Sequence, residues 1–159
     1  MNNTFLIVAN WKANTVPLTT WLQKFRADYG ELSSGGTQVE VAIAASYPTL
    51  FLLEDTLYHL ASQDISLFAE GAYTGEVPAA QLHEFGVTYT LLGHSERRKH
   101  LGETTEMVDK KLEQAMNSKL IPIICAQTLD EIPKSIANYS ADSYYVMYEP
   151  AEAISTNVH

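Results

Sequence analysis

Six short runs rich in apolar residues alternate with longer segments of helical character, and this alternation most strongly constrains the fold. Most of the runs are nearly continuous in apolar residues, as is typical of strands buried on both faces of a parallel sheet. The predicted strands are residues 4–9, 39–45, 65–69, 88–93, 120–126 and 143–148. The alternation therefore predicts an α/β fold in which right-handed crossovers join parallel strands.

The segments between these runs carry apolar residues at helical spacing and several helix-end signals. Pro17 is typical of a helix start, Gly86 of a helix end, and Thr104 or Thr105 of an N-cap. The predicted helices are residues 17–32, 49–61, 78–86, 104–119 and, limited by Pro133, 129–140. No linker divides the chain, so residues 1–159 are predicted to form a single domain. Periodicity alone does not separate an open doubly wound sheet from a barrel.

Charge and cysteine content restrict the partners and the compartment. The chain has 10 Lys+Arg against 19 Asp+Glu, a net charge of −9, which argues against a nucleic acid or an anionic membrane as partner. One cysteine permits no disulfide within the chain and fits a reducing compartment. No apolar segment approaches the roughly 20 residues of a membrane span. The sequence predicts a soluble, cytoplasmic protein.

Polar side chains follow the first predicted strand. Asn10 and Lys12 are two residues apart, so they share one face if the strand continues that far. In α/β folds the functional sites lie at the carboxyl ends of strands. An amide and an ammonium there suit an anionic or carbonyl substrate, and the alternative is an ordinary surface lysine.

The fourth and sixth predicted strands end in further ionisable residues. His94 and Glu96 follow "TLLG", and a histidine in that place suits an electrophile or a proton shuttle. Glu149 follows the last apolar run and suits a general base, and the small polar segment after it is typical of a lid. The alternative for His94 and Glu96 is a solvated charged loop, and the alternative for Glu149 is a solvated loop acid. No metal-ligand spacing and no glycine-rich nucleotide motif is present, so neither metal nor cofactor is predicted.

Three stretches together carry a resemblance to a known family: "NWKAN" (10–14), "AEGAYTGEVPAAQLHEFGVTYTLLGHSERR" (69–98) and "YEPAEAIST" (148–156). Over essentially its whole length the chain resembles the triosephosphate isomerase family. The resemblance implies a TIM (β/α)8 barrel of which this chain carries about six β/α units. It also implies an isomerase of glycolysis and gluconeogenesis that interconverts dihydroxyacetone phosphate and D-glyceraldehyde 3-phosphate through an enediolate, without cofactor or metal. A cytoplasmic homodimer is expected.

The resemblance also assigns catalytic roles. Glu149 matches the base that moves the proton between adjacent carbons, and His94 matches the neutral electrophile that polarises the carbonyl. Lys12 matches the cation that faces the negative charge of the phosphorylated triose, and Asn10 matches a neighbouring polar contact.

Four further residues have supporting roles by the same resemblance. Glu96 and Arg97 support the loop that carries the histidine, and the backbone N–H of Ser155 suits the substrate's phosphate. Thr74 matches the tip of a loop that family dimers insert beside the partner's site.

The chain departs from the family at three places. "CAQT" (125–128) stands where members have "CIGE", so that loop lacks its acid. In the lid, Glu152 replaces an aromatic residue, and Ser155 and Asn157 replace glycines, which predicts slower or altered closure. The resemblance ends in the lid, before strands seven and eight. Three interpretations stay open: a fragment of a longer enzyme, a short form completed by oligomerisation, and a catalytically inactive binding or oligomerisation module.

Overall fold

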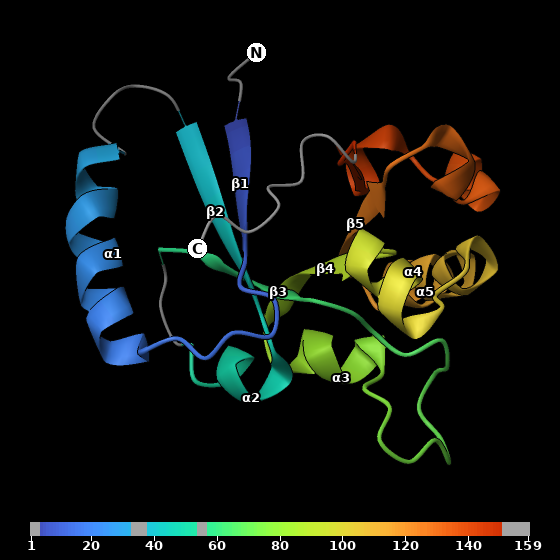
Figure 1. Cartoon of the computed structure of the whole chain (residues 1–159), viewed down its shortest axis with the longest axis horizontal. Coiled ribbons are helices and arrows are strands. Elements are labelled where there is room, and N and C mark those ends of the chain that lie inside the picture. Colours follow the sequence, from blue (N-terminus) through green and yellow to red (C-terminus); the bar gives the residue numbers. More distant parts are fainter. Residues whose placement is uncertain (1–3, 33–37, 54–56, 151–159) are drawn as a thin grey trace. The chain divides into compact units, whose positions relative to one another are not determined.

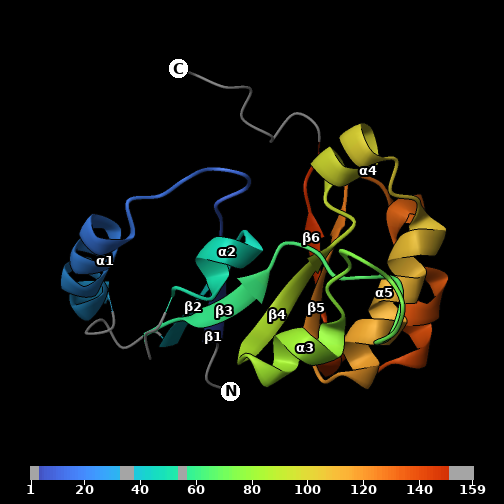
Figure 2. The same ribbon diagram turned by 90° about the horizontal axis from the view of Figure 1, so that it is seen from below.

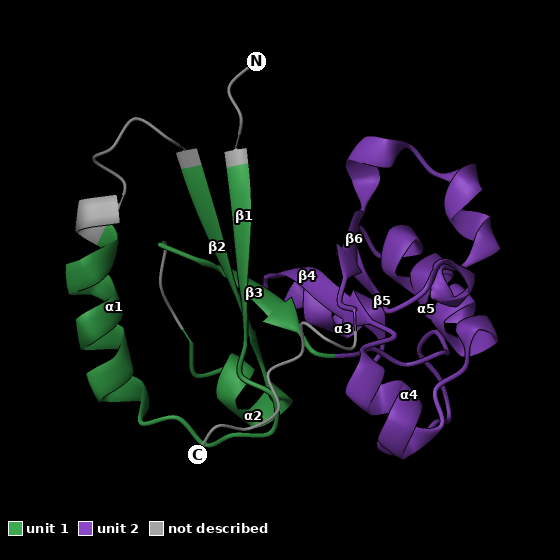
Figure 3. Cartoon of the chain, turned by 45° about the horizontal axis from the view of Figure 1, so that its top comes forward, with its two compact units in different colours: residues 1–63 green, residues 64–159 purple. Residues whose placement is uncertain are grey.

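The computed structural model of the chain (Figure 1) describes residues 4–32, 38–53 and 57–150. The chain divides into two compact units, residues 1–63 and 64–159 (Figure 3). Each unit holds three parallel strands, and each is described by itself. The prediction of a single domain stays a prediction.

The first unit is built on the strand order β1-β2-β3. Its strands are β1 (Thr4–Asn10), β2 (Gln38–Ala45) and β3 (His59–Ser62), and its helices are α1 (Leu18–Leu32) and α2 (Tyr47–Leu50). β2 is central and residues 41–45 are buried, with Ile43 fully inaccessible. This burial accounts for the continuous apolar run in the sequence of β2.

Aromatic side chains hold α1 against the rest of the first unit. Trp21 and Phe25 stack with ring centroids 4.9 Å apart, and Tyr58 meets both rings edge-on at 6.2 and 5.6 Å. One turn further along, the Tyr29 hydroxyl donates a hydrogen bond to the Val39 carbonyl of β2 (3.1 Å). These residues form the apolar stripe that the sequence predicts for this helix.

The third strand and the helix before it differ from the prediction. The helix predicted at 49–61 is wrong, because α2 covers only Tyr47–Leu50 and residues 59–62 form β3. β3 pairs with β2 in the register Ala42↔His59 to Ala45↔Ser62. The apolar residues of this segment recur at helical spacing, but that spacing does not include contacts with distant residues. In the structure the backbone N–H and C=O groups of residues 59–62 pair with the buried strand β2 instead.

The strand predicted at 65–69 is also wrong, because this segment has no regular secondary structure. The Ser66 backbone N–H donates to the Val77 carbonyl (2.9 Å), and the Phe68 N–H donates to Ser66 Oγ (3.0 Å). Ile65 and Ser66 are nevertheless buried, at 1% and 3% exposure. A buried loop start therefore produced the apolar pattern that the sequence analysis interpreted as a strand.

The second unit is built on the strand order β4-β5-β6. Its strands are β4 (Val87–Leu92), β5 (Ile121–Ala126) and β6 (Tyr145–Tyr148), and its helices are α3 (Ala79–Glu84), α4 (Ser95–Leu101) and α5 (Thr105–Asn117). α5 packs along β4 and β5 (Figure 2), burying Val108, Leu112 and Ala115 as its sequence predicts. None of the helices in the described part of the chain is long and apolar enough to cross a membrane.

The predicted helix ends in the second unit are confirmed at two places. The Thr104 side chain accepts a hydrogen bond from the Met107 N–H (3.3 Å) as N-cap of α5. Gly86, which follows the C-cap residue Phe85 of α3, adopts φ 79°, a conformation that glycine tolerates. Residues 129–140 form two short 3-10 helices (Leu129–Glu131 and Lys134–Asn138) in place of the predicted helix, interrupted at Pro133. A third 3-10 helix covers Ala141–Ser143. α4 forms where the sequence also allowed a charged loop.

Candidate active site

His94 lies at the end of β4, where it caps the following helix. Its backbone is extended, and its Nδ1 accepts a hydrogen bond from the Glu96 backbone N–H (3.2 Å) at the start of α4. The residue is 7% exposed. Because Nδ1 is an acceptor, the neutral imidazole carries its proton on Nε2 and presents that N–H as a donor.

Glu149 lies at the end of β6 and approaches the same imidazole. Its backbone N–H donates to the Ala126 carbonyl at the end of β5 (2.9 Å), which ties it to the neighbouring strand. Its Oε2 lies 3.6 Å from His94 Nε2. That distance is longer than a hydrogen bond. The second unit thus places a carboxylate and an imidazole donor side by side at the carboxyl ends of its strands, where α/β folds hold their sites.

The turn between β4 and His94 requires glycine for two reasons. Gly93 adopts φ 72°, which side chains with a Cβ rarely adopt. A Cβ at this position would also lie 2.8 Å from Arg98 Nη2 and 2.9 Å from Val108 Cγ2. Val108 is fully buried, so it has no room to move away. The position of His94 therefore depends on the absence of a side chain before it.

We expect Gly93→Ala to lower the free energy of unfolding by about 2–4 kcal/mol, because left-handed strain and overpacking act together. Gly102, at φ 68° with nothing within 4 Å of an added Cβ, provides the matched control. Gly102→Ala introduces the strain without the clash and should cost about 1–2 kcal/mol. Urea unfolding of both variants measures the difference, and equal losses would contradict the packing argument.

Arg98 stabilises the loop around His94 through three hydrogen bonds. Its Nε donates to the Gly93 carbonyl (2.9 Å), Nη1 to Thr105 Oγ1 (3.3 Å) and Nη2 to the Glu131 carbonyl (2.9 Å). Glu131 Oε2 in turn accepts from the Gln127 backbone N–H (2.6 Å). Arg98 and Glu131 were not predicted as positioning residues, although Glu131 brings an acid to the loop in which "CAQT" lacks one.

Arg97 belongs to a buried ionic cluster that consists of Asp64, Arg97, Glu103 and Lys111. Arg97 Nη2 lies 2.6 Å from Asp64 Oδ2, and its Nε lies 3.3 Å from Glu103 Oε2. The Lys111 ammonium bonds both Asp64 oxygens (2.6 and 2.8 Å) and Glu103 Oε1. Burial raises the pKa of Asp64, and the charge of Lys111 opposes that increase. The cluster joins the start of α4 to α5.

Glu96, the other predicted supporting residue, keeps its carboxylate near the imidazole. Its Oε2 lies 3.7 Å from His94 Nδ1, and 46% of its side chain is exposed. Its strongest link to His94 is through its own backbone N–H. The Glu96 carboxylate therefore lies at ion-pair distance from the imidazole that its backbone N–H holds in place.

Asn10 and Lys12 lie at the end of β1 in the first unit. The Lys12 N–H donates to Asn10 Oδ1 (2.9 Å), and the lysine adopts φ 53°. Trp11 turns into packing, with its ring 4.8 Å from that of Trp21. Because these residues and His94 belong to separate units, their predicted grouping in one site stays a prediction.

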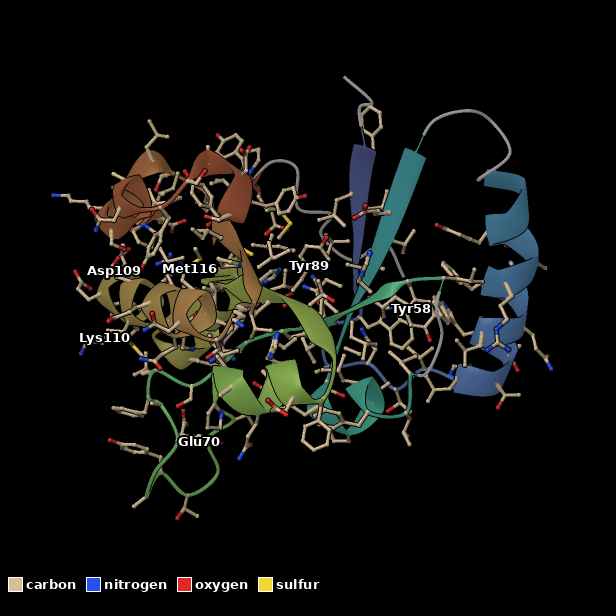
Figure 4. The ribbon with its side chains drawn as sticks, turned by 180° about the vertical axis from the view of Figure 1, so that it is seen from behind. Tyr58, Glu70, Tyr89, Asp109, Lys110 and Met116 are labelled. Carbon is tan, nitrogen blue, oxygen red and sulfur yellow. The ribbon has the colours of Figure 1, made fainter. Side chains whose placement is uncertain are left out.

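The remaining predicted site residues lie on a loop and beyond the described residues. Thr74 is exposed on the loop between β3 and α3, on which Figure 4 labels Glu70. On this loop the rings of Phe68 and Tyr73 stack at 4.1 Å while 40% and 46% exposed. Ser155 lies outside the described residues, as do Glu152 and Asn157.

Cys125 is buried in β5 near the candidate site, where its surroundings disfavour the thiolate. Burial, followed by the charge of Glu149, raises the pKa of its thiol to about 12. The side chain is 1% exposed. It is a small core residue, as its place in an apolar run indicates.

We therefore expect Cys125 to resist a thiol-disulfide reagent such as DTNB at mildly alkaline pH in the folded protein. The rise of the thiol pKa from its usual value of 9.0 to about 12 lowers the fraction of thiolate about a thousandfold. In denaturant the same thiol should react within minutes, as ordinary cysteines do. Rapid, complete labelling of the folded chain would contradict this burial.

Comparison with known proteins gives a family match. The family model described as triosephosphate isomerase matches residues 5–159. Triosephosphate isomerase of Dictyoglomus thermophilum is 34% identical, and that of Paracidovorax citrulli 38%; each alignment covers 95% of this chain and 68% of the relative. The chain thus spans about two thirds of the length of these relatives.

Comparison with solved structures concerns the fold. The crystal structure of triosephosphate isomerase from Bartonella henselae matches with a TM-score of 0.72 at 24% identity, over 91% of this chain and 67% of that one. This likeness confirms the predicted α/β fold of TIM-barrel type, of which the described residues form six strands.

Proposed function

Since the chain belongs to the triosephosphate isomerase family, we propose that it interconverts dihydroxyacetone phosphate and D-glyceraldehyde 3-phosphate. The observation that carries the proposal is the approach of Glu149 Oε2 to His94 Nε2, 3.6 Å apart at the ends of β6 and β4. A proton transfer next to a carbonyl needs a positioned carboxylate and a donor where negative charge develops on oxygen. The pair supplies both groups.

Glu149 acts as the base in the proposed mechanism. Its carboxylate takes a proton from the hydroxymethyl carbon of dihydroxyacetone phosphate, and the C–H electron pair forms the enediolate double bond as the carbonyl oxygen becomes negative. The resulting carboxylic acid returns a proton to the neighbouring carbon, which gives the aldehyde. The backbone hydrogen bond from Glu149 to Ala126 holds the base at the strand end during both steps.

His94 acts as the electrophile. Its Nδ1 accepts from the Glu96 N–H, so its Nε2–H is directed to the developing oxyanion and lowers the energy of the enediolate. The imidazole also carries hydroxyl protons between the two substrate oxygens. The reaction as proposed requires neither metal nor redox cofactor.

Asn10, Lys12 and Ser155 bind the substrate in this proposal. The ammonium of Lys12, which is exposed at the end of β1, faces the negative charge of the phosphorylated triose, and Asn10 supplies a polar contact beside it. The backbone N–H of Ser155 binds the phosphate. Glu96 and Arg97 support the histidine loop, Arg97 through its ion pairs with Asp64 and Glu103.

We also propose a cytoplasmic homodimer with Thr74 at the contact. The exposed Phe68–Tyr73 stack on the same loop supports this, because two exposed aromatic rings favour burial against a partner. Sedimentation of the chain and of Thr74→Arg tests it. A lower mass for the variant is expected, and a monomeric unmodified chain would contradict the dimer.

A catalytically inactive module is not favoured. Such a module has no need of a carboxylate and an imidazole donor at adjacent strand ends, yet Glu149 and His94 are both present and close together. Their retention supports isomerase activity.

A coupled isomerase assay tests the proposed function. The chain is given D-glyceraldehyde 3-phosphate, and dihydroxyacetone phosphate is followed by its NADH-dependent reduction. Turnover above that of His94→Asn is expected. A folded chain that shows neither turnover nor binding of 2-phosphoglycolate, an enediolate mimic, would contradict the proposal and favour the inactive module.

A further inference from the structure

Gln63, which follows β3 in the first unit, donates to three oxygen atoms at the ends of β1 and β2. Its Nε2 lies 2.9 Å from the Lys12 carbonyl, 2.9 Å from the Ala44 carbonyl and 3.3 Å from Asn10 Oδ1. An amide NH₂ has two protons, so each of the two short contacts uses one proton. The longer contact to Asn10 Oδ1 shares one of these protons. A single side chain thus ties the three strand ends together.

These contacts hold a lysine in an unusual conformation. Lys12 adopts φ 53°, in the left-handed region that residues with a Cβ rarely enter and that is retained only where the surroundings enforce it. Its N–H is held by Asn10 Oδ1 (2.9 Å), and its carbonyl is held by Gln63. Trp11, which lies between Asn10 and Lys12 in the sequence, donates its backbone N–H to the Ala44 carbonyl (2.9 Å). Both sides of the Lys12 backbone are therefore restrained.

The direction of the Lys12 side chain follows from this backbone. The Cα–Cβ bond of a residue at positive φ points to a side that the ordinary extended conformation does not reach. We propose that Gln63 is a positioning residue: it enforces the left-handed turn at Lys12 and so directs the ammonium to an anionic, phosphorylated substrate. This inference rests on the proposed function for the role of Lys12, although the contacts of Gln63 do not.

The orientation of the Gln63 amide makes the inference specific. All three neighbours of Nε2 are oxygen atoms without a proton to donate, so only an NH₂ group fits there. Gln63→Glu keeps the size but places a carboxylate oxygen against carbonyl and amide oxygens. Gln63→Met keeps the approximate length and removes the donor without adding charge. Gln81→Glu makes the same chemical change at an exposed position of α3 and is the matched control.

The test combines steady-state kinetics with amide exchange. We expect Gln63→Met to lower kcat/KM about 10–100-fold, and Gln63→Glu to lower it more, while Gln81→Glu has no effect. Because Gln63 acts through Lys12, the double variant Gln63→Met/Lys12→Met should be no worse than Lys12→Met alone. A further 10–100-fold loss in the double variant would overturn the inference, because it would mean that Gln63 acts independently of the lysine.

Hydrogen exchange of the Lys12 amide separates the inference from the proposed function. Exchange should accelerate about tenfold or more in Gln63→Met and remain unchanged in Gln81→Glu, since the loop loses its restraint only in the former. An unchanged exchange rate in Gln63→Met would overturn the inference whether or not the chain turns over. Absence of turnover in the unmodified chain would contradict the proposed function without affecting this measurement.

Discussion

Glu149→Gln is expected to lower kcat by about 10³-fold and to leave the folded structure intact. The amide that replaces the carboxylate cannot accept the substrate proton, and positioned acid–base groups contribute about 10²–10⁴-fold to rate. The side chain is 28% exposed at the end of β6, so the change leaves no buried charge unpaired. KM should change much less than kcat, because the base acts in the transition state more than in substrate binding.

The control for this substitution is Glu113→Gln, which makes the same chemical change on the exposed face of α5. Its kinetics should match those of the unmodified chain. Steady-state assays of the three proteins, with circular dichroism to confirm folding, measure the effect. If Glu149→Gln retained the kcat of Glu113→Gln, the assignment of the base would be wrong.

Lys111→Met is expected to lower the free energy of unfolding by about 3–5 kcal/mol, which is a large share of the about 5–15 kcal/mol of an ordinary domain. The Lys111 side chain is 4% exposed, and its ammonium lies between Asp64 and Glu103. Without it, Arg97 is the only cation in the ionic cluster, facing two carboxylates in a poorly solvated space. The loss arises from burying an uncompensated negative charge.

The neighbouring residue provides the control for this prediction. Lys110 lies on the same helix but points into solvent (Figure 4), so Lys110→Met should change stability by no more than about 0.5 kcal/mol. The double variant Lys111→Met/Glu103→Leu should recover part of the loss, because it restores the charge balance. Urea unfolding measures all three. Equal losses for Lys110→Met and Lys111→Met would contradict the buried pair.

Much of the fold is predictable from local patterns in the sequence. The run at 39–45 is continuous in apolar residues because β2 is the central strand of its unit, and Thr104 and Gly86 mark helix ends through their own backbone chemistry. β3 was missed because residues 59–62 become a strand through pairing with β2, a distant contact that leaves no local period. A strand that forms through a distant partner therefore cannot be predicted from its own local pattern.

For the candidate site, too, one part could be predicted from the sequence and another part required the three-dimensional structure. The sequence places His94 and Glu149 at strand ends, but their approach to 3.6 Å depends on how parallel strands align. Gln63 and Glu131 were missed because a single amide or acid after a strand has no distinctive spacing; their contacts with Lys12 and Gln127 appear only in three dimensions. The family resemblance is confirmed. The catalytic roles that it implies for His94 and Glu149 stay a prediction, and it did not point to Gln63 or Glu131.

The most direct test of the account is deuterium incorporation into dihydroxyacetone phosphate in D₂O, followed by NMR. If Glu149 removes a proton from the hydroxymethyl carbon and exchanges it with solvent, the unmodified chain should incorporate one deuterium at that carbon, and Glu149→Gln should slow incorporation about 10³-fold. No deuterium in the presence of the folded, unmodified chain, or equal incorporation by Glu149→Gln, would contradict proton transfer by Glu149 through an enediolate.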